Sequence, residues 1–266
     1  MNKFKTNLVT AAACIASTFL FFPVASVSAA ALTSTNNPSN FITYKVPALT
    51  NDPLDPRMFS QSVLKHWVSN PIKEDVPKDK IWNINLKNPI SKDNFNDSSI
   101  FVLDDKNNKV AANLALSDDG KQIKVSPMVN YNPAHGYLLC IIGSDNGTCM
   151  PFTINSDSVK VDQSFNSKSI TLKKGETLQL TLPNVGYDGG YSWKLNSFDN
   201  SVIKNTDNFN IRTSLYPGRC PGGGLDNRWL FKAVNTGTTS LNLEYQRSWE
   251  GSSSDINTFK LNINVQ

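Results

Sequence analysis

The chain has 266 residues, with 26 Lys and Arg against 22 Asp and Glu, a formal net charge of +4 and four cysteines. Two of the positive charges, Lys3 and Lys5, lie in a leader segment, so the rest of the chain carries only +2, which is too close to neutral for electrostatic binding of nucleic acid. Beyond that leader, no segment is apolar enough to span a membrane.

Residues 1–30 have the pattern of a secretory signal peptide. A positive start is followed by an apolar run over residues 8–24 and by Val27-Ser28-Ala29, a small-residue cleavage site. An uncleaved membrane anchor is one alternative, but the apolar run is short for a span and is interrupted by Pro23. Lipidation at Cys14 is another. With the abundance of Asn, Lys and Ser, the leader predicts a protein that a Gram-positive bacterium secretes or displays on its surface.

The remaining chain, about 236 residues, suits two domains of ordinary size. Residues 31–79 form a lead-in that is rich in Pro, Asn and Ser and has few periodic runs. Residues 56–69 are the exception and predict a short helix, whose apolar face would carry Met58, Val63, Leu64 and Trp67. We therefore predict a mostly irregular lead-in with one short helix.

Residues 80–156 change to the pattern of β-strands. In the first run, Trp82, Ile84 and Leu86 alternate with polar neighbours, as in a strand with one buried face. Short strands at this spacing predict a small β-sandwich. The further strands are expected at residues 99–103, 111–116, 121–126, 136–142 and 148–154.

The order of Trp, Pro, Asp and Tyr residues from Trp82 to Tyr137 resembles the bacterial Ig-like domains of surface-layer and cell-wall proteins. The shared features concern fold and location rather than chemistry. The resemblance implies an Ig-like spacer or attachment module over residues 80–156, with cell-wall material as a partner.

Three cysteines follow the leader: Cys140, Cys149 and Cys220. The first two flank the turn-forming run 143–147, so they face each other across a predicted hairpin. In an oxidising compartment Cys140 and Cys149 would form a disulfide, and two reduced, half-buried thiols are the alternative. Cys220 has no partner by this count and is available for intermolecular pairing.

Residues 157–266 predict a second β-sandwich. Strands are expected at residues 169–172 and 177–182, at 229–234 and 240–245, and at 257–265, where apolar and polar residues alternate to the end. The predicted fold class is thus all-β, with two Ig-like antiparallel β-sandwiches in tandem after the signal peptide and the lead-in.

Three short stretches of this second domain lie at turns between the expected strands: Gly190-Tyr191-Ser192-Trp193, Pro221-Gly222-Gly223-Gly224 and Arg247-Ser248-Trp249-Glu250. Alternate turns of a sandwich collect at one end, so these stretches are expected to meet in space. Tyr, Trp and Arg are also the residue types that dominate binding interfaces. For Trp193, burial in the core is the competing interpretation.

In order and spacing, the three stretches resemble the loops of the chagasin-type inhibitors of papain-family cysteine proteases. Family members carry Asn-Pro-Thr-Thr-Gly-Tyr-x-Trp, Gly-x-Gly-Gly and Arg-Pro-Trp-Glu. This chain departs from them in the first loop, where residues 185–189 or, in another alignment, residues 183–187 replace the Asn-Pro-Thr-Thr core. Ser248 replaces the proline of the third loop, which removes a φ restraint.

The resemblance implies a secreted, reversible inhibitor that blocks a protease cleft with three loops. By this resemblance the first loop would lie nearest the catalytic cysteine of the protease, and the other two would lie on either side. The implied protease-binding residues are Val185, Gly186, Tyr187, Asp188, Gly189, Gly190, Tyr191, Pro221, Gly222, Gly223, Gly224, Arg247, Ser248, Trp249 and Glu250.

Other functional classes fit the sequence less well. His135 and Cys140 are five residues apart on one expected strand and would point to opposite faces, so they form no catalytic dyad. We expect no enzyme, no catalytic residue, no metal and no cofactor. Two alternatives remain: a structural or adhesive cell-wall module without inhibitory activity, and a sugar-binding sandwich that would expose Trp193 and Trp249 as a coplanar pair.

Overall fold

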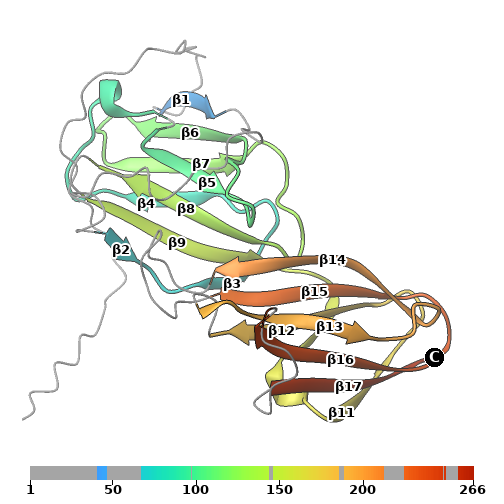
Figure 1. Cartoon of the computed structure of the whole chain (residues 1–266). Coiled ribbons are helices and arrows are strands. Elements are labelled where there is room, and N and C mark those ends of the chain that lie inside the picture. Colours follow the sequence, from blue (N-terminus) through green and yellow to red (C-terminus); the bar gives the residue numbers. More distant parts are fainter. Residues whose placement is uncertain are drawn as a thin grey trace, which may run out of the picture.

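The computed structural model describes residues 41–46, 67–96, 98–143, 146–185, 189–212, 225–247, 249 and 257–266. Over these residues the chain forms two β-sandwiches, one following the other along the chain (Figure 1). This confirms the predicted all-β fold. No helix in the described part of the chain is long and apolar enough to cross a membrane.

The first sandwich consists of two sheets. One has the strand order β1-β6-β7-β4, and the other has the order β2-β9-β8-β5 with β3 also paired to β9. The 3-10 helix η2 (Lys92–Asn94) precedes β5. The strands are β1 (Phe41–Val46), β2 (Trp67–Ser69), β3 (Lys73–Val76), β4 (Trp82–Asn85), β5 (Ile100–Leu103), β6 (Ala112–Ser117), β7 (Gln122–Pro127), β8 (Gly136–Ile142) and β9 (Gly147–Ile154).

The second sandwich also consists of two sheets, with the strand orders β10-β12-β15-β14 and β11-β17-β16-β13. The 3-10 helix η3 (Gln163–Phe165) lies between β10 and β11. The strands are β10 (Ser158–Val161), β11 (Lys168–Leu172), β12 (Thr177–Asn184), β13 (Tyr191–Ser197), β14 (Ile203–Arg212), β15 (Leu225–Ala233), β16 (Gly237–Arg247) and β17 (Asn257–Val265).

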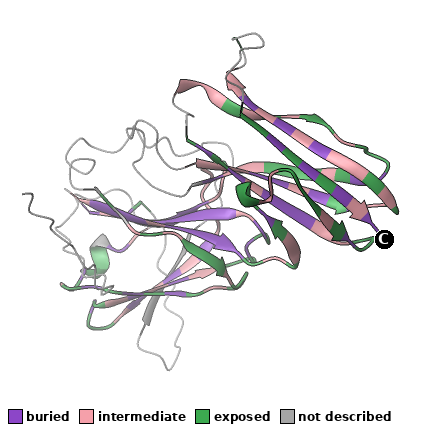
Figure 2. Cartoon of the chain, turned by 90° about the horizontal axis from the view of Figure 1, so that it is seen from below, coloured by how far each residue is buried: buried purple, intermediate pink, exposed green. Residues whose placement is uncertain are grey.

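Each sandwich has its own core, built from strands in which every second residue is apolar. In β17, Phe259, Leu261, Ile263 and Val265 are buried while the residues between them face outward. Figure 2 shows this alternation of buried and more exposed positions along the strands. The burial of one face fixes the register, because a slip by one residue would turn the apolar set toward water.

Four edge pairs are parallel, which the prediction of antiparallel sandwiches missed. In the first sandwich, β2 and β3 both pair with β9 in parallel. In the second, β10 pairs with β12 and β11 pairs with β17 in the same way. These strands are joined to their partners by crossover connections rather than by hairpins. The sequence therefore has no turn motif that would predict the pairing.

The lead-in contributes strands as well, so it is less irregular than expected. The helix predicted over residues 56–69 is wrong at its end, because residues 67–69 form β2; residues 56–66 lie outside the described part of the chain. Strand β3 was missed because its sequence is Lys-Glu-Asp-Val and it is mostly exposed. It therefore lacks the alternation of apolar and polar residues that indicates a strand. The alternation of Ile42, Tyr44 and Val46 is the signal that would have revealed β1.

Cys140 and Cys149 lie directly opposite each other on β8 and β9. Both are buried, in a small apolar cluster with Phe101, Leu103 and Leu138. The pairing therefore has the register that a disulfide needs, while the bond itself stays a prediction. Mass spectrometry of the alkylated protein, with and without prior reduction, would test it. Cys220 lies outside the described residues.

Candidate functional site

Three connections leave the second sandwich at the same end. Across its first sheet, Asn184 at the end of β12 and Arg212 at the end of β14 both lie opposite Leu225, the first residue of β15. Across the second sheet, Tyr191 lies opposite Arg247, and Tyr245 lies opposite Asn257. The connections that begin after β12, β14 and β16 therefore start from one end of the sandwich (Figure 1).

Two of these connections are tied to each other by Arg247. Its Nε donates a hydrogen bond to the carbonyl oxygen of Gly189, at 2.8 Å. Its guanidinium lies over the ring of Tyr191, 4.5 Å from the ring centroid, and Tyr191 in turn stacks on Tyr245 at 5.4 Å. A planar guanidinium suits both contacts at once, because it can donate in its plane and stack on its face. The third connection thereby supports the end of the first.

Trp249 packs directly on Gly190. The φ angle of Gly190 is +78°, and a Cβ added there would lie 2.0 Å from Cη2 of the indole. Glycine is therefore required twice, for its backbone conformation and for the space that the ring occupies. Trp249 nevertheless stays 68% exposed. One side of its ring is held by the protein, and the rest is presented to solvent.

The base of the first connection is fixed by two polar contacts. The indole Nε1 of Trp193 donates to the carbonyl oxygen of Pro183 at 2.8 Å. The hydroxyl of Tyr245 donates to Oδ1 of Asn184 at 2.9 Å, and both of these residues are buried. A buried hydrogen bond of this kind is costly to break, because the remaining partner loses both water and its donor.

We expect Tyr245→Phe to lower the free energy of unfolding by about 1–3 kcal/mol, because Oδ1 of Asn184 would keep its burial and lose its donor. Urea unfolding of the variant would measure this loss. The second change Asn184→Leu, made in the Tyr245→Phe background, should recover part of the stability, since both polar partners would then be replaced by apolar groups. No loss in the single variant would show that the hydrogen bond contributes nothing.

The structure brings together five of the predicted site residues and leaves others undescribed. Gly189, Gly190, Tyr191, Arg247 and Trp249 form one packed group, which we call the loop-end cluster. Val185 directly follows β12 and is 69% exposed. The remaining predicted residues lie outside the described part of the chain: Gly186, Tyr187, Asp188, Pro221, Gly222, Gly223, Gly224, Ser248 and Glu250.

Trp193 belongs mainly to the core. It is half-buried, packs against the core of the second sandwich, and lies 5.0 Å from Tyr245 at an interplanar angle of 41°. Its indole nitrogen is also occupied by Pro183. The exposed coplanar pair of Trp193 and Trp249, which a sugar-binding surface would need, is therefore not present among the described residues.

Sequence reasoning missed Asn184 as a supporting residue. The signal was present, because Leu178, Leu180, Leu182 and Asn184 occupy successive inward positions of one alternating strand. A polar residue at the inward position nearest a loop needs a partner, and the buried Tyr245 supplies it. Among the described residues, no group of three His, Cys, Asp or Glu side chains is placed to hold a metal ion.

Comparison with known proteins locates a family in the second sandwich. Residues 171–263 match the family described as Chagasin family peptidase inhibitor I42. This part of the chain is thus a domain of an inhibitor family and not an enzyme. No match was found among curated proteins.

Three of the solved structures that are similar to this chain each match about two fifths of it. A cysteine protease inhibitor from Entamoeba histolytica is 12% identical with a TM-score of 0.34, and the match covers 40% of this chain and 93% of that one. Amebosin is 28% identical with a TM-score of 0.36, and the match covers 42% and 100%. PbICP-C in complex with falcipain-2 is 20% identical with a TM-score of 0.28, and the match covers 42% and 93%.

Proposed function

Residues 171–263 form a chagasin-family domain, and on this premise we propose that the chain is a secreted, reversible inhibitor of papain-family cysteine proteases. The observation that carries the proposal is the loop-end cluster. It lies within the family-matched residues, at the end of the sandwich from which all three motif-bearing connections start. The predicted contact residues, from Val185 to Tyr191, Pro221 to Gly224 and Arg247 to Glu250, belong to those connections or, for Tyr191 and Arg247, to the strand ends that adjoin them.

The proposed mechanism needs no bond to be cut. The inhibitor would insert its three loops into the protease cleft as a wedge. Arg247 donates a hydrogen bond to the carbonyl oxygen of Gly189, and the ring of Trp249 packs on Gly190. These residues are therefore ordered before the inhibitor binds a protease. Preorganised contacts lower the entropic cost of association. An exposed indole that is already fixed on one side supplies contact area with few side-chain degrees of freedom to lose.

Titration of the mature protein into papain and a cathepsin L-type enzyme, followed by hydrolysis of a fluorogenic peptide, tests the proposal. Inhibition that is tight and is reversed on dilution would support it. A variant with Gly190, Gly223 and Trp249 all replaced should lose inhibition. Inhibition that survives in this variant would refute the loop-wedge mechanism, and a wild-type protein inactive against a panel of papain-family enzymes would refute the function.

Trp249→Ala is expected to weaken inhibition by about 30-fold or more, because an exposed, rigid Trp in the loop-end cluster has the properties of an interface hot spot. Its exposure means that the free energy of unfolding should change by no more than about 0.5 kcal/mol. Val129→Ala is the matched control, since Val129 is 75% exposed and lies in the first sandwich. Equal inhibition constants for the two variants would remove Trp249 from the binding surface.

The alternative is a structural or adhesive cell-wall module. The observation in its favour is the altered first loop, in which residues 185–189 lack the Asn-Pro-Thr-Thr core of the family. Under this reading the Ig-like first sandwich would attach the protein to cell-wall material. A pull-down with purified peptidoglycan and surface-layer material separates the two readings, because an inhibitor needs no wall ligand.

A further inference from the structure

The two sandwiches meet at a defined junction, where β14 of the second lies against the start of β8 of the first. Arg228 reaches across it from β15 and donates to the carbonyl oxygen of Ala134, while its Nε donates to Oγ1 of Thr181 at 2.9 Å. Ile211 fills the space beside Gly136, where an added Cβ would lie 2.7 Å from its Cδ1. Lys160 and Asp75 form a separate ion pair across the junction, at 2.5 Å.

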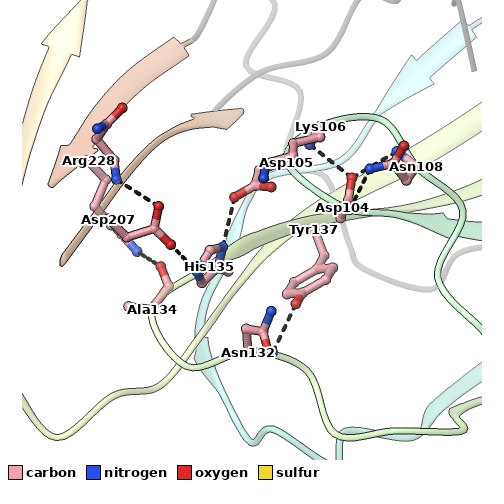
Figure 3. Close-up of polar contacts among 11 residues, drawn as sticks. Asp104, Asp105, Lys106, Asn108, Asn132, Ala134, His135, Tyr137, Asp207 and Arg228 are labelled. Carbon is pink, nitrogen blue, oxygen red and sulfur yellow. Dashed lines mark hydrogen bonds and ion pairs between the residues drawn. The ribbon is translucent and has the colours of Figure 1, made fainter. Parts of the chain in front are cut away.

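His135 lies at the centre of this junction, between two carboxylates. Its Nδ1 is 2.8 Å from Oδ2 of Asp105, in the turn after β5 of its own sandwich. Its Nε2 is 3.3 Å from Oδ2 of Asp207, on β14 of the other sandwich. Phe209 stacks on the imidazole, with the ring centroids 4.0 Å apart and the planes 15° from parallel. Figure 3 shows the imidazole bridging the two carboxylates.

The geometry requires two N–H donors on one ring. A neutral imidazole has one N–H and one lone pair, so it can donate to only one of the two carboxylates. Asp105 is the closer of the two and has 5% of its side chain exposed against 47% for Asp207, so we expect the neutral ring to keep its N–H on Nδ1 and to turn the lone pair of Nε2 toward Asp207. A protonated imidazole donates to both and neutralises part of their charge. The Asp105 side chain is 5% exposed, so few water molecules can replace a hydrogen bond that its carboxylate loses.

We propose that His135 is a protonation-dependent clasp between the two sandwiches: with its proton it links Asp105 to Asp207, and without it the link across the junction is lost. Histidine ordinarily changes charge between about pH 5 and pH 8, whereas carboxylates and lysine keep theirs over that range. This inference does not depend on the proposed inhibitory function.

Several other groups near the ring have partners of their own, and the backbone N–H of Asn208 donates to Oδ1 of Asp207 at 2.8 Å. On β8, the hydroxyl of Tyr137 accepts a hydrogen bond from the backbone of Asn132, and the pKa of Tyr137 is raised to about 12 by burial, so it stays neutral. In the turn after β5, the Asp104 carboxylate accepts backbone N–H groups of Lys106 and Asn108. From β15, Arg228 bonds the carbonyl next to His135. The pair that changes with the proton is thus Asp105 and Asp207.

A double-mutant cycle on the full mature chain tests the clasp. His135→Gln, Asp207→Asn and the double variant are unfolded in urea at about pH 5.5 and about pH 8, on either side of the histidine titration. At the lower pH we expect the coupling between the two positions to change the unfolding equilibrium constant by about 5-fold or more. At the higher pH the coupling should vanish. A coupling that is absent at the lower pH, or equal at both, overturns the proposal.

A second cycle, on Lys160→Met and Asp75→Asn, provides the control for this ion pair. Lysine and aspartate ordinarily keep their charges between these two pH values, so the coupling in the second cycle should be the same at both. Small-angle scattering gives an independent measure of how the sandwiches are arranged. His135→Gln at the lower pH should scatter like the wild type at the higher pH. If the wild-type curve is the same at both pH values, His135 does not govern the junction.

Discussion

Replacing Gly190 by alanine is expected to weaken inhibition of a papain-family protease by about 30-fold or more while leaving the second sandwich folded. The added Cβ would lie 2.0 Å from Cη2 and 2.8 Å from Cζ3 of Trp249, so the indole must move away from residue 190. The φ of +78° adds backbone strain that alanine cannot relieve. The inhibition constant measures the effect, and the melting temperature shows that the fold persists.

Gly175→Ala is the matched control for this experiment. Gly175 also has a positive φ, +92°, but nothing lies within 4 Å of its Cβ position, and it is in the turn between β11 and β12. The Gly175→Ala variant should therefore be less stable by about 1–2 kcal/mol because of backbone strain, and it should inhibit the protease as well as the wild type does. Comparing the two variants separates strain from the displacement of Trp249. If both variants inhibit as the wild type does, the packing of Trp249 on Gly190 has no part in binding the protease.

Phe231→Ala is expected to destabilise the second sandwich by about 3–5 kcal/mol, the largest effect among the single substitutions considered. Phe231 is fully buried on β15, with Phe198 edge-on at 5.4 Å. Its removal leaves a cavity between two sheets that cannot close without moving both. Urea unfolding of the full chain would measure the change.

Leu230→Ala provides the comparison, because Leu230 is the neighbour of Phe231 on the same strand, faces the other way and is only partly buried. It should cost less than half as much. Equal losses at the two positions would mean that the two faces of β15 contribute alike, which contradicts a core confined to the inner face. Since β15 begins at Leu225, where the connection from β14 ends, loss of this core would also disorder the loop-bearing end.

Five of the eight strands described in the second sandwich were predicted from their apolar residues, whereas no strand range was predicted for β10, β13 or β14. The last strand was predicted at residues 257–265, where the structure places β17. Other boundaries fell short: β15 begins at Leu225 and β16 extends to Arg247, beyond the apolar runs that revealed them. The added residues are held by cross-strand hydrogen bonds near the loops, which depend on the partner strand and leave no period in the sequence.

The site was predictable only as a set of motifs meeting at one end. The approach of Tyr191 and Arg247 follows from their being opposite each other on β13 and β16. The packing of Trp249 on Gly190 does not follow from any spacing, because it depends on the conformation of the two connections. The junction around His135 was equally hidden, since it depends on how two separately folded cores are placed against each other.

The position of β3 has a consequence for access to the loop-bearing end. A cleft of about 470 Å³ separates the sandwiches, with Ile72 and Glu74 on one wall and Pro183 and Asp226 on the other. Pro183 and Asp226 are each one residue from a loop root, at Asn184 and Leu225. A partner covering the β12–β15 side of that end therefore meets the first sandwich as a neighbouring wall. The direction from which a partner can approach this side of the end is therefore restricted by the chain itself.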